Sequence, residues 1–359
     1  MVATFQEDTA PSSVSSSPLQ VFSTMSLTRP TLLSSSSSSF QDLKKIPHHP
    51  LLPLLNHSLA INGGLILIHL LLTCANHMAS GSLQNANAAL DQLSHLVSPD
   101  GDTMQRVAAY FTEALANRIL KSWPAFNSRP EGPPHLRITG VHLHKEKLDI
   151  PFQFNPVVSS LDCLNVDQLR VKTGEALAVS SVLQLHTFLA SDSDMSNNNG
   201  HSLRKIDRFL NAIWGLSPKI MVVTEQHSDH NGSTLMQRLL ESLYSYAALF
   251  DCLENKIPRT SQDRIKVEKM LFGEEIKNII ACEGSERRER HEKLEKWSQR
   301  IDLAGFGNVP LSYYVMLQAR RLLQDYGFYG YMIKEESGCA VICWQDRPLY
   351  SVSAWRCSK

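Results

Sequence analysis

The hydrophobic pattern of this 359-residue chain changes from a helical to a β-strand period within one short stretch, residues 118–141. An amphipathic run ends at Trp123-Pro124, a Pro- and Gly-rich turn follows, and residues 136–141 then read as a buried strand. Proline lacks a backbone donor and ends a helix, so the run before it cannot continue. The chain is therefore expected to join a helical region directly to a sheet, which restricts the folds open to it.

The region before this junction has a helical period. Apolar residues recur at spacings of three and four from Leu65 to Lys121, which predicts a bundle of about three helices. Ser82 is a candidate N-cap of the middle helix, and Pro99-Asp-Gly101 separates it from the third. The most apolar run, 65–74, is about half of the roughly 20 residues that span a bilayer, so a core helix is predicted there.

The region after the junction alternates strands and helices. Four strands buried on both faces, as in a parallel sheet, are predicted at residues 136–141, 151–154, 177–186 and 219–225. A polar loop and an amphipathic helix separate the last two, at residues 191–200 and 203–216. Further helices are predicted at about 233–255, 263–281, 285–303 and 310–326, followed by two or three antiparallel strands from Tyr331 onward. This order predicts an α/β layered fold with a helical cap.

The connections of the predicted sheet are incomplete. Parallel neighbours need a crossover of about a dozen or more residues, but only eight residues separate Val141 from Ile150. A doubly wound sheet also normally begins with a strand that leads to the ligand site, and none precedes Leu136 after the helical region. Either these strands are not parallel neighbours, or a crossover is missing from the chain.

Composition narrows the function classes. The 35 basic and 35 acidic side chains cancel, which argues against strong non-specific nucleic-acid binding. Seven scattered cysteines and the absence of a secretory leader after Met1 predict a reducing compartment with free thiols. Residues 1–60 are rich in serine, and we expect them to be disordered.

No catalytic or metal motif stands out. Gly-rich phosphate loops, Gly-x-Ser-x-Gly, His-Glu-x-x-His and paired C-x-x-C are all absent. His227-Ser-Asp229-His230 has ligand-like spacing, but a polar turn is favoured over a metal site. Cys339 and Cys343 lie on one face of a predicted strand, where core packing is favoured over zinc. By elimination, a binding or regulatory role outranks an enzymatic one.

Two other patterns each have two interpretations. Residues 286–296 (ERRERHEKLEK) alternate acid and base at a spacing of four, which favours a solvated helix over a nucleic-acid patch. Leu294, Trp297 and Ile301 would form the buried stripe of that helix. Residues 67–71 fit L-x-x-L-L, a pattern by which helices dock into partner grooves, although leucine-rich core helices look the same.

Several strings together resemble the plant GRAS family of transcriptional regulators. The segment 67–120 resembles the family's first leucine-rich region, and PFQFNPVV, LAVSSVLQLH and KIMVVTEQ resemble its PFYRE region. Arg287-Arg-Glu289-Arg290 stands where the RVER element belongs, and CWQDRPLYSVSAWR resembles the SAW motif. The likeness is greatest to a branch with a short Ser-rich head.

The resemblance implies an α/β fold in which a helical cap covers a methyltransferase-like Rossmann core, with a β-hairpin at the carboxyl end. It implies a nuclear co-regulator without cofactor, metal or catalysis, linked to gibberellin responses, whose partners are other GRAS proteins and DNA-binding transcription factors. Its partner-binding candidates are leucines of the first region, Leu67, Leu70, Leu71, Leu90 and Leu93. Its structural motif residues are Arg287, Glu289, Arg290, Trp297, Trp344, Ser353, Ala354 and Trp355.

The chain departs from the family pattern at the places where the connections are incomplete. The VHIID element, which should follow the first leucine-rich region, is absent, and the second leucine-rich region is cut to HLHKEKLDIP. The incomplete core would therefore lack its first strand. The expected organisation is a disordered segment 1–60 and a GRAS-type domain 61–359, divided into 61–123, 135–225 and 226–359. A non-functional or dominant-interfering fragment and a methyltransferase-like enzyme are the alternatives.

Overall fold

The computed structural model describes residues 62–121, 176–190, 204–325 and 329–358, with the shorter pieces 157, 166–169, 171, 174 and 327. The contacts divide the chain into two compact units. Unit 1 contains the described residues up to Ile119 together with Ser228–Ala281 and Trp344–Leu349, and unit 2 contains the others. The segment 1–60, the predicted strands at 136–141 and 151–154, and the polar loop at 191–200 lie outside the described residues.

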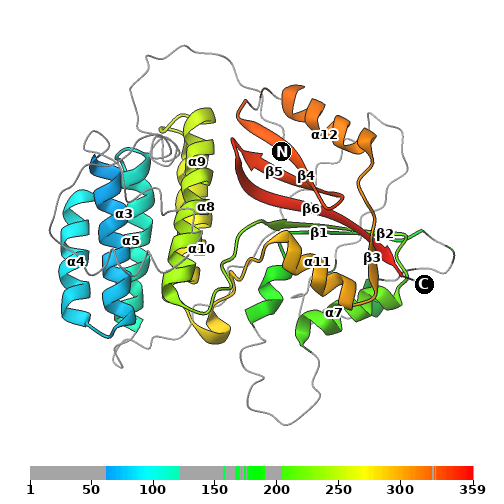
Figure 1. Cartoon of the computed structure of the whole chain (residues 1–359), viewed down its shortest axis with the longest axis horizontal. Coiled ribbons are helices and arrows are strands. Elements are labelled where there is room, and N and C mark those ends of the chain that lie inside the picture. Colours follow the sequence, from blue (N-terminus) through cyan, green and yellow to red (C-terminus); the bar gives the residue numbers. More distant parts are fainter. Residues whose placement is uncertain are drawn as a thin grey trace, which may run out of the picture. The chain divides into compact units, whose positions relative to one another are not determined.

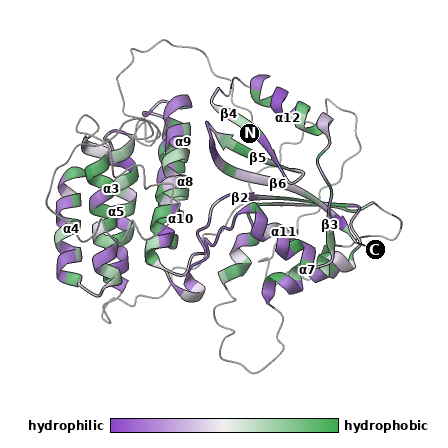
Figure 2. Cartoon of the chain, viewed as in Figure 1, coloured by the Kyte–Doolittle hydropathy of each residue, from purple (hydrophilic) through white to green (hydrophobic). Residues whose placement is uncertain are grey.

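Unit 1 is helical, as the 3.6-residue period predicted. The predicted three-helix bundle is confirmed as α3 (Asn62–Ala79), α4 (Leu83–Leu96) and α5 (Thr103–Lys121). The later helices of this unit are α8 (Leu235–Lys256), α9 (Gln262–Lys266), the π-helical η7 (Val267–Gly273) and α10 (Glu274–Ala281). Figure 2 shows that α3, α4 and α5 each carry both hydrophobic and hydrophilic residues, as expected for helices that are buried on one side.

Local polar contacts set where these helices begin. The Asp102 carboxylate accepts from the Gln105 backbone N–H at 2.9 Å, and the Gln105 side chain accepts from the Asp102 N–H, so α5 starts with a capping box. Thr234 and Gln237 form the same arrangement at α8. Ser82 occupies the N-cap position of α4 as predicted, but its hydroxyl accepts from the Asn85 side chain rather than from a backbone N–H.

Aromatic rings join the early and late helices of unit 1. The Phe111 and Tyr246 rings meet edge to face at 6.5 Å between centroids. The Phe272 ring, on η7, lies 5.9 Å from that of Tyr246 and 5.7 Å from that of Phe250. Such tilted pairs add to the stability that their buried area gives.

Glu254 makes the stability of unit 1 depend on pH. Burial alone would raise the pKa of this carboxyl, but hydrogen bonds from Arg259 and Arg264 outweigh burial and lower the pKa below its ordinary value of 4.5. The unfolded carboxyl therefore binds a proton more readily than the folded one, and stability is lost as the pH falls below about 4.5. We expect acid unfolding, followed by circular dichroism, to be shallower over this range in Glu254→Gln, which cannot titrate. Equal slopes would contradict the assignment.

Unit 2 contains a mixed sheet. Its described strands are β1 (Ala178–Val182), β2 (Ile220–Gln226), β3 (Phe306–Asn308), β4 (Tyr331–Glu336), β5 (Cys339–Trp344) and β6 (Arg347–Cys357). They run in the order β1-β2-β6-β5-β4, and β3 pairs with β6. β1 and β2 are parallel and β6 is antiparallel to β2. The helix α7 (Lys205–Gly215) connects β1 to β2, which confirms the amphipathic helix predicted at 203–216.

The carboxyl-terminal strands agree with the sequence prediction. Ser337 and Gly338 form the turn between β4 and β5, and both residues have positive φ, as a type I′ hairpin turn requires. The predicted helix at 310–326 is α12 (Tyr313–Asp325). Cys339 and Cys343 of β5 are buried and pack with Leu294 and Val341, so the core interpretation of these cysteines is confirmed.

One strand prediction was wrong in its burial. The run 177–186 was expected to form a strand that is buried on both faces, but β1 covers only Ala178–Val182 and its residues alternate between exposed and half-buried. β1 stands at the end of the strand order, with β2 as its one hydrogen-bonded neighbour among the described strands. A strand at the end of a sheet has less covering material than a central strand, so the apolar run did not indicate full burial.

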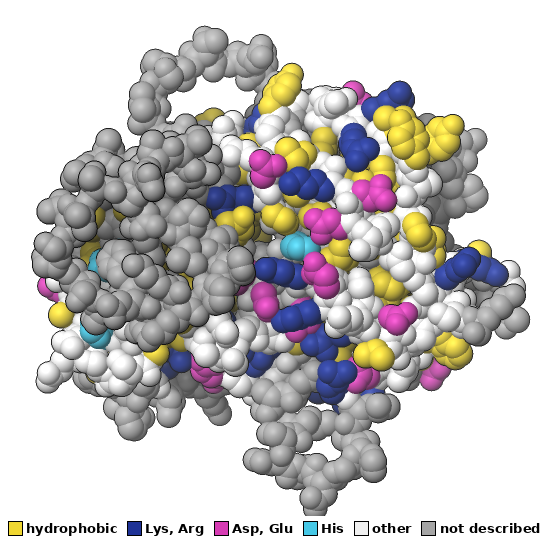
Figure 3. All heavy atoms as spheres, in the orientation of Figure 1, with side chains coloured by type: hydrophobic (Ala, Val, Ile, Leu, Met, Phe, Trp, Pro, Cys, Tyr) yellow, Lys and Arg dark blue, Asp and Glu magenta, His cyan; other side chains and the backbone are white. Residues whose placement is uncertain are grey.

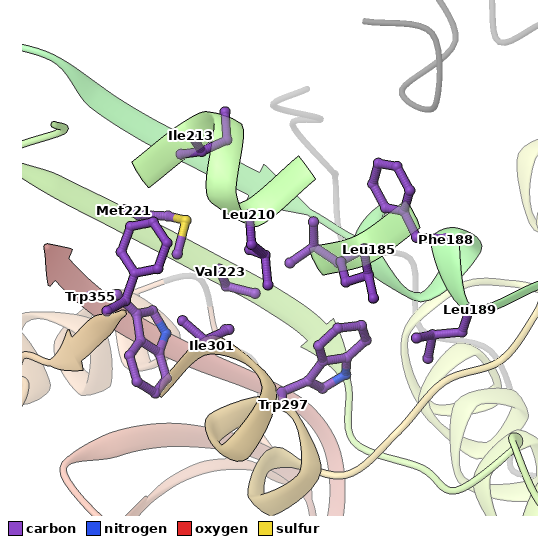
Figure 4. Packing of buried hydrophobic residues seen from close by; sticks show 12 residues of the cluster. Leu185, Phe188, Leu189, Leu210, Ile213, Met221, Val223, Trp297, Ile301 and Trp355 are labelled. Carbon is purple, nitrogen blue, oxygen red and sulfur yellow. The ribbon is translucent and has the colours of Figure 1, made fainter. Parts of the chain in front are cut away.

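The core of unit 2 lies on one face of the sheet. Figure 1 shows α7 and α11 (Leu294–Leu303) on one side of the sheet and α12 on the other. The cluster between the sheet and the first two helices contains Leu185, Phe188, Leu189, Ile206, Leu210, Ile213, Met221, Val223, Trp297, Ile301, Phe306 and Trp355. Figure 4 shows the indole rings of Trp297, from α11, and Trp355, from β6, turned into this layer.

Candidate functional site

Three of the five predicted partner-binding leucines are buried. Leu67 and Leu71 of α3 and Leu93 of α4 belong to the core of unit 1, while Leu70 and Leu90 are half-buried. The two helices pack against each other, and α3 also packs against α8. The L-x-x-L-L pattern is thus mainly a core pattern here, and only its middle leucine reaches the partly exposed face.

Other apolar residues of the same helices are exposed. Ile66 lies four residues before Leu70, so the two side chains share a face of α3, and Leu83 and Leu96 are exposed on α4. Sequence reasoning missed these three residues because it looked for one apolar stripe on each helix. The signal was present, since α3 is apolar around more of its circumference than one buried stripe requires.

A second apolar surface lies on α12 of unit 2. Tyr313 and Tyr314 are 71% and 76% exposed, Leu322 is exposed as well, and Met316 is the buried residue of this helix. Hydrophobic side chains gather over this helix at the upper right of Figure 3. Exposed aromatic residues that lie close together are typical of protein-binding surfaces.

The motif segment 286–296 is not the solvated helix that its charge pattern predicted. A 3-10 turn covers Gly284–Glu286, extended backbone follows, and α11 begins only at Leu294. Four of the polar residues are buried, namely Arg287, Arg290, His291 and Glu292. The buried charges of this segment make contacts that an exposed helix would not allow, and such contacts stabilise a buried charge more than an exposed helical pair does.

Two buried charges of this segment, Arg290 and Glu292, have well-defined hydrogen-bond partners. The Arg290 guanidinium donates to the carbonyl oxygens of Gly284 and Arg287 at 2.7 and 2.9 Å. Glu292 accepts two hydrogen bonds from Arg300 of α11, at 2.7 and 3.0 Å. The RVER-like element therefore fixes the backbone that leads into α11, which carries Trp297 into the core.

Two histidines and two glutamates of unit 2 form a compact cluster, which we call the His–Glu cluster. His186 follows β1, and its Nδ1 lies 2.9 Å from the Glu225 carboxylate at the end of β2. Its Nε2 lies 3.0 Å from Glu289 Oε2. His291 Nε2 lies 3.4 Å from the same oxygen, and the two imidazole rings are 4.1 Å apart.

The electrostatics of His186 follow from these contacts. Burial alone would lower the pKa of this imidazole, but the hydrogen bonds with Glu225 and Glu289 outweigh burial and raise its pKa to about 10. Glu225 is fixed in turn, because its other oxygen accepts from the backbone N–H groups of Gln184 and Leu185 at 3.0 and 2.8 Å. Sequence reasoning missed this cluster because its members lie up to 105 positions apart.

The described residues hold one group of three or more metal-type ligands, and it is His186, Glu289 and His291. It does not include His227, Asp229 or His230. His230 is fully buried, and its ring stacks on that of Tyr246 at 5.8 Å between centroids.

The SAW-like strand β6 supplies both packing and hydrogen bonds. Trp355 is buried, and its indole N–H donates to the Ser353 hydroxyl at 2.8 Å. That hydroxyl in turn donates to the Val223 carbonyl at 3.5 Å. Ala354 is buried and pairs with Val222 of β2. At the end of β5, the Trp344 N–H donates to the buried Asp251 carboxylate at 2.7 Å. The predicted motif tryptophans thus have structural roles.

The surface shows no large field of one sign on the face that is drawn. Lys and Arg side chains lie among Asp and Glu side chains there (Figure 3). This mixture agrees with the zero net charge of the whole chain. Among the described helices, none is long and apolar enough to cross a membrane.

Comparison with known proteins gives consistent results. The sequence matches the GRAS domain family over residues 67–127 and 123–356. It is 61% identical to Scarecrow-like protein 3 of Arabidopsis thaliana, with both chains covered in full, and 31% identical to DELLA protein RGL1 of Arabidopsis thaliana over 82% of this chain and 71% of that protein. The crystal structure of SCL7 in Oryza sativa matches with a TM-score of 0.66 and 26% identity, over 81% of this chain and 99% of that chain.

The matches also bear on the junction at Trp123-Pro124. The family match breaks into two pieces, and they meet at residues 123–127. The alignment with Scarecrow-like protein 3 spans 495 residues, whereas this chain has 359, so at least 136 aligned positions have no counterpart here. Both findings agree with the absence of the VHIID element from the sequence. Apart from this break, the family match, the similar sequences and the similar crystal structure all agree. The chain belongs to the GRAS domain family.

Proposed function

We propose that this protein is a nuclear transcriptional co-regulator of plant development and gibberellin-type hormone responses, which acts through protein–protein contacts. Its membership of the GRAS family and its identity with Scarecrow-like protein 3 and a DELLA protein support this proposal. Other GRAS-family proteins and DNA-binding transcription factors are the proposed partners. The parallel β1–α7–β2 unit is the part of the fold that supports a methyltransferase-like Rossmann core.

One observation carries the part of the proposal that concerns partner binding. Outside the core of unit 1, α3 and α4 still expose large apolar side chains, Ile66, Leu83 and Leu96. Exposed apolar residues on neighbouring helices have a cost in water unless a partner covers them. The half-buried Leu70 and Leu90 lie on the same two helices, so they remain partner-binding candidates, whereas Leu67, Leu71 and Leu93 act through the core.

The test compares exposed apolar positions on α3 and α4 with an exposed apolar position in unit 2. We expect Ile66→Ser combined with Leu83→Ser to weaken association with a second GRAS-family protein at least about tenfold in a co-precipitation titration, because losing one hot-spot side chain already costs about 2 kcal/mol. Leu303→Ser is the matched control, since Leu303 is 82% exposed but lies in unit 2. It should bind like the wild type.

Several outcomes decide between the alternatives. Wild-type binding by the Ile66/Leu83 variant would contradict a partner surface on these helices. A single cooperative thermal transition of the full chain is expected, and its absence would favour the interfering-fragment alternative. Saturable binding of S-adenosylmethionine in calorimetry would favour a methyltransferase-like enzyme.

A further inference from the structure

The His–Glu cluster brings three metal-type ligand atoms together. The ligand atoms of His186, Glu289 and His291 all lie within 4.8 Å of one another. The two imidazole Nε2 atoms flank one carboxylate oxygen, at 3.0 and 3.4 Å. Both histidines are buried, while Glu289 has 22% of its side chain exposed, so the cluster has one side toward solvent.

These spacings match those of a zinc ion's ligands. Zinc binds imidazole nitrogen and carboxylate oxygen at about 2.1 Å in a tetrahedral arrangement, so neighbouring ligand atoms lie about 3.4 Å apart. The distances from Glu289 Oε2 to the two Nε2 atoms are 3.0 and 3.4 Å, so one equals this value and the other is a few tenths of an ångström shorter. Small side-chain rotations are enough to move a ligand atom by a few tenths of an ångström, so an ion could bind with little rearrangement.

Glu225 supplies the support that metal-binding histidines usually have. A ligating imidazole generally donates its other ring N–H to a carboxylate, which fixes the tautomer and the ring orientation. His186 makes this contact through Nδ1 at 2.9 Å, and two backbone N–H groups hold the Glu225 carboxylate in place. His186 Nε2 is thereby directed at Glu289.

The position of the cluster in the fold also points to a ligand site. Glu225 ends β2, and His186 follows its parallel neighbour β1. The carboxyl ends of parallel strands are where α/β folds place their ligands.

We propose that His186, Glu289 and His291 form a binding site for a zinc-type divalent cation, with Glu225 as a positioning residue. The ion joins the segment after β1 to the RVER-like segment before α11. Its role is structural, because it fixes how these two segments meet. The site takes one ion per chain.

The first test measures binding to the wild-type chain. The full-length protein, free of affinity tags, is treated with a chelator and titrated with Zn²⁺ in a calorimeter. We expect about one equivalent to bind, with a higher melting temperature when the site is filled. Co²⁺ in place of Zn²⁺ should give the visible absorption of a tetrahedral site, and Mg²⁺, which prefers octahedral oxygen ligands, should not compete. This test needs no variant to fold.

The second test assigns the ligands. Glu289→Gln and His291→Gln should each weaken Zn²⁺ binding at least about tenfold, and Glu225→Gln should weaken it about 10- to 100-fold through the orientation of His186. Melting curves of the metal-free variants show whether each is folded. His95→Gln is the control, because His95 is exposed on α4 in unit 1.

Two results would overturn the proposal. One is a folded wild-type chain that binds no Zn²⁺ and gives no Co²⁺ spectrum, which would leave the cluster as a proton-bridged ion pair. The other is Zn²⁺ binding that Glu289→Gln and His291→Gln leave unchanged, which would assign the ion to other histidines, such as His48-His49.

Discussion

Replacing Trp355 by alanine is expected to lower the free energy of unfolding by about 4 kcal/mol, within the range of about 3 to 5 kcal/mol for large aromatic residues in a core. Urea unfolding followed by circular dichroism measures the change, since the substitution alters the tryptophan fluorescence itself. The size follows from the position of the residue. Trp355 is 2% exposed and packs in the unit 2 cluster with Met221, Ile301 and Phe306.

Two effects contribute to the loss of stability in Trp355→Ala. The lost indole leaves a cavity between the sheet and α11, and packed cores relax only partly around such a cavity. The variant also removes the N–H that donates to Ser353, although the Ser353 hydroxyl keeps its bond to the Val223 carbonyl. Trp355→Phe should therefore recover part of the loss, because it fills most of the volume.

Tyr314→Ala is the matched control for Trp355→Ala. Tyr314 is also aromatic and also belongs to unit 2, but it is 76% exposed. Its replacement should change the free energy of unfolding by less than about 0.5 kcal/mol. If Trp355→Ala cost no more than this control, the SAW-like strand would not contribute to the core as described.

Periodicity located most of the described elements. Helices α3, α5, α7, α8 and α12 and strands β2, β4, β5 and β6 all lie where the sequence predicted them. Several of them combine a clear period with a turn or cap at one end, such as Ser337-Gly338 between β4 and β5. Turns and caps depend on only a few neighbouring residues, so they can be recognised in a single sequence. The burial of β1 depends on neighbours elsewhere in the chain, and the prediction failed there.

The RVER-like segment shows why charge patterning can mislead. Its acid–base spacing of four is typical of an exposed helix, and such pairs contribute about 0.3 to 0.5 kcal/mol each. In the structure, Glu289 meets His186 and Glu292 meets Arg300, which are partners that the spacing does not reveal. Buried contacts of charged groups are worth more than exposed pairs. The residue types of the His–Glu cluster can be read from the chain, but their close approach in the fold cannot.

The leucine pattern did not decide between two kinds of helix. L-x-x-L-L fits a docking helix and a core helix equally well, and the structure gives Leu67 and Leu71 to the core. The helical period also shows that Ile66 and Leu83 lie on apolar sides of their helices. Which side of each helix is buried depends on how α3 and α4 pack. The junction at Trp123-Pro124 was different, because the usual order of a doubly wound sheet indicated a missing strand there and the two pieces of the family match meet there.

Replacing Glu268 by glutamine is expected to lower the free energy of unfolding by about 3 to 5 kcal/mol, because it leaves buried cations without their counter-charge. The Glu268 carboxylate accepts from Arg264 at 2.8 Å and also from Arg106. All three side chains are at most 5% exposed. Arg264 keeps its hydrogen bond to Glu254, so Arg106 is the residue that mainly loses its counter-charge.

Chemical unfolding of Glu268→Gln beside Asp263→Asn measures this effect. Asp263 pairs with Lys266 in the same helical region, but those side chains are 91% and 65% exposed, so the control should lose no more than about 1 kcal/mol. The double variant Glu268→Met/Arg106→Met should be more stable than Glu268→Gln, since removing both buried charges avoids the unpaired cation. A Glu268→Gln loss no larger than that of Asp263→Asn would show that water reaches this network and that its charges are not buried.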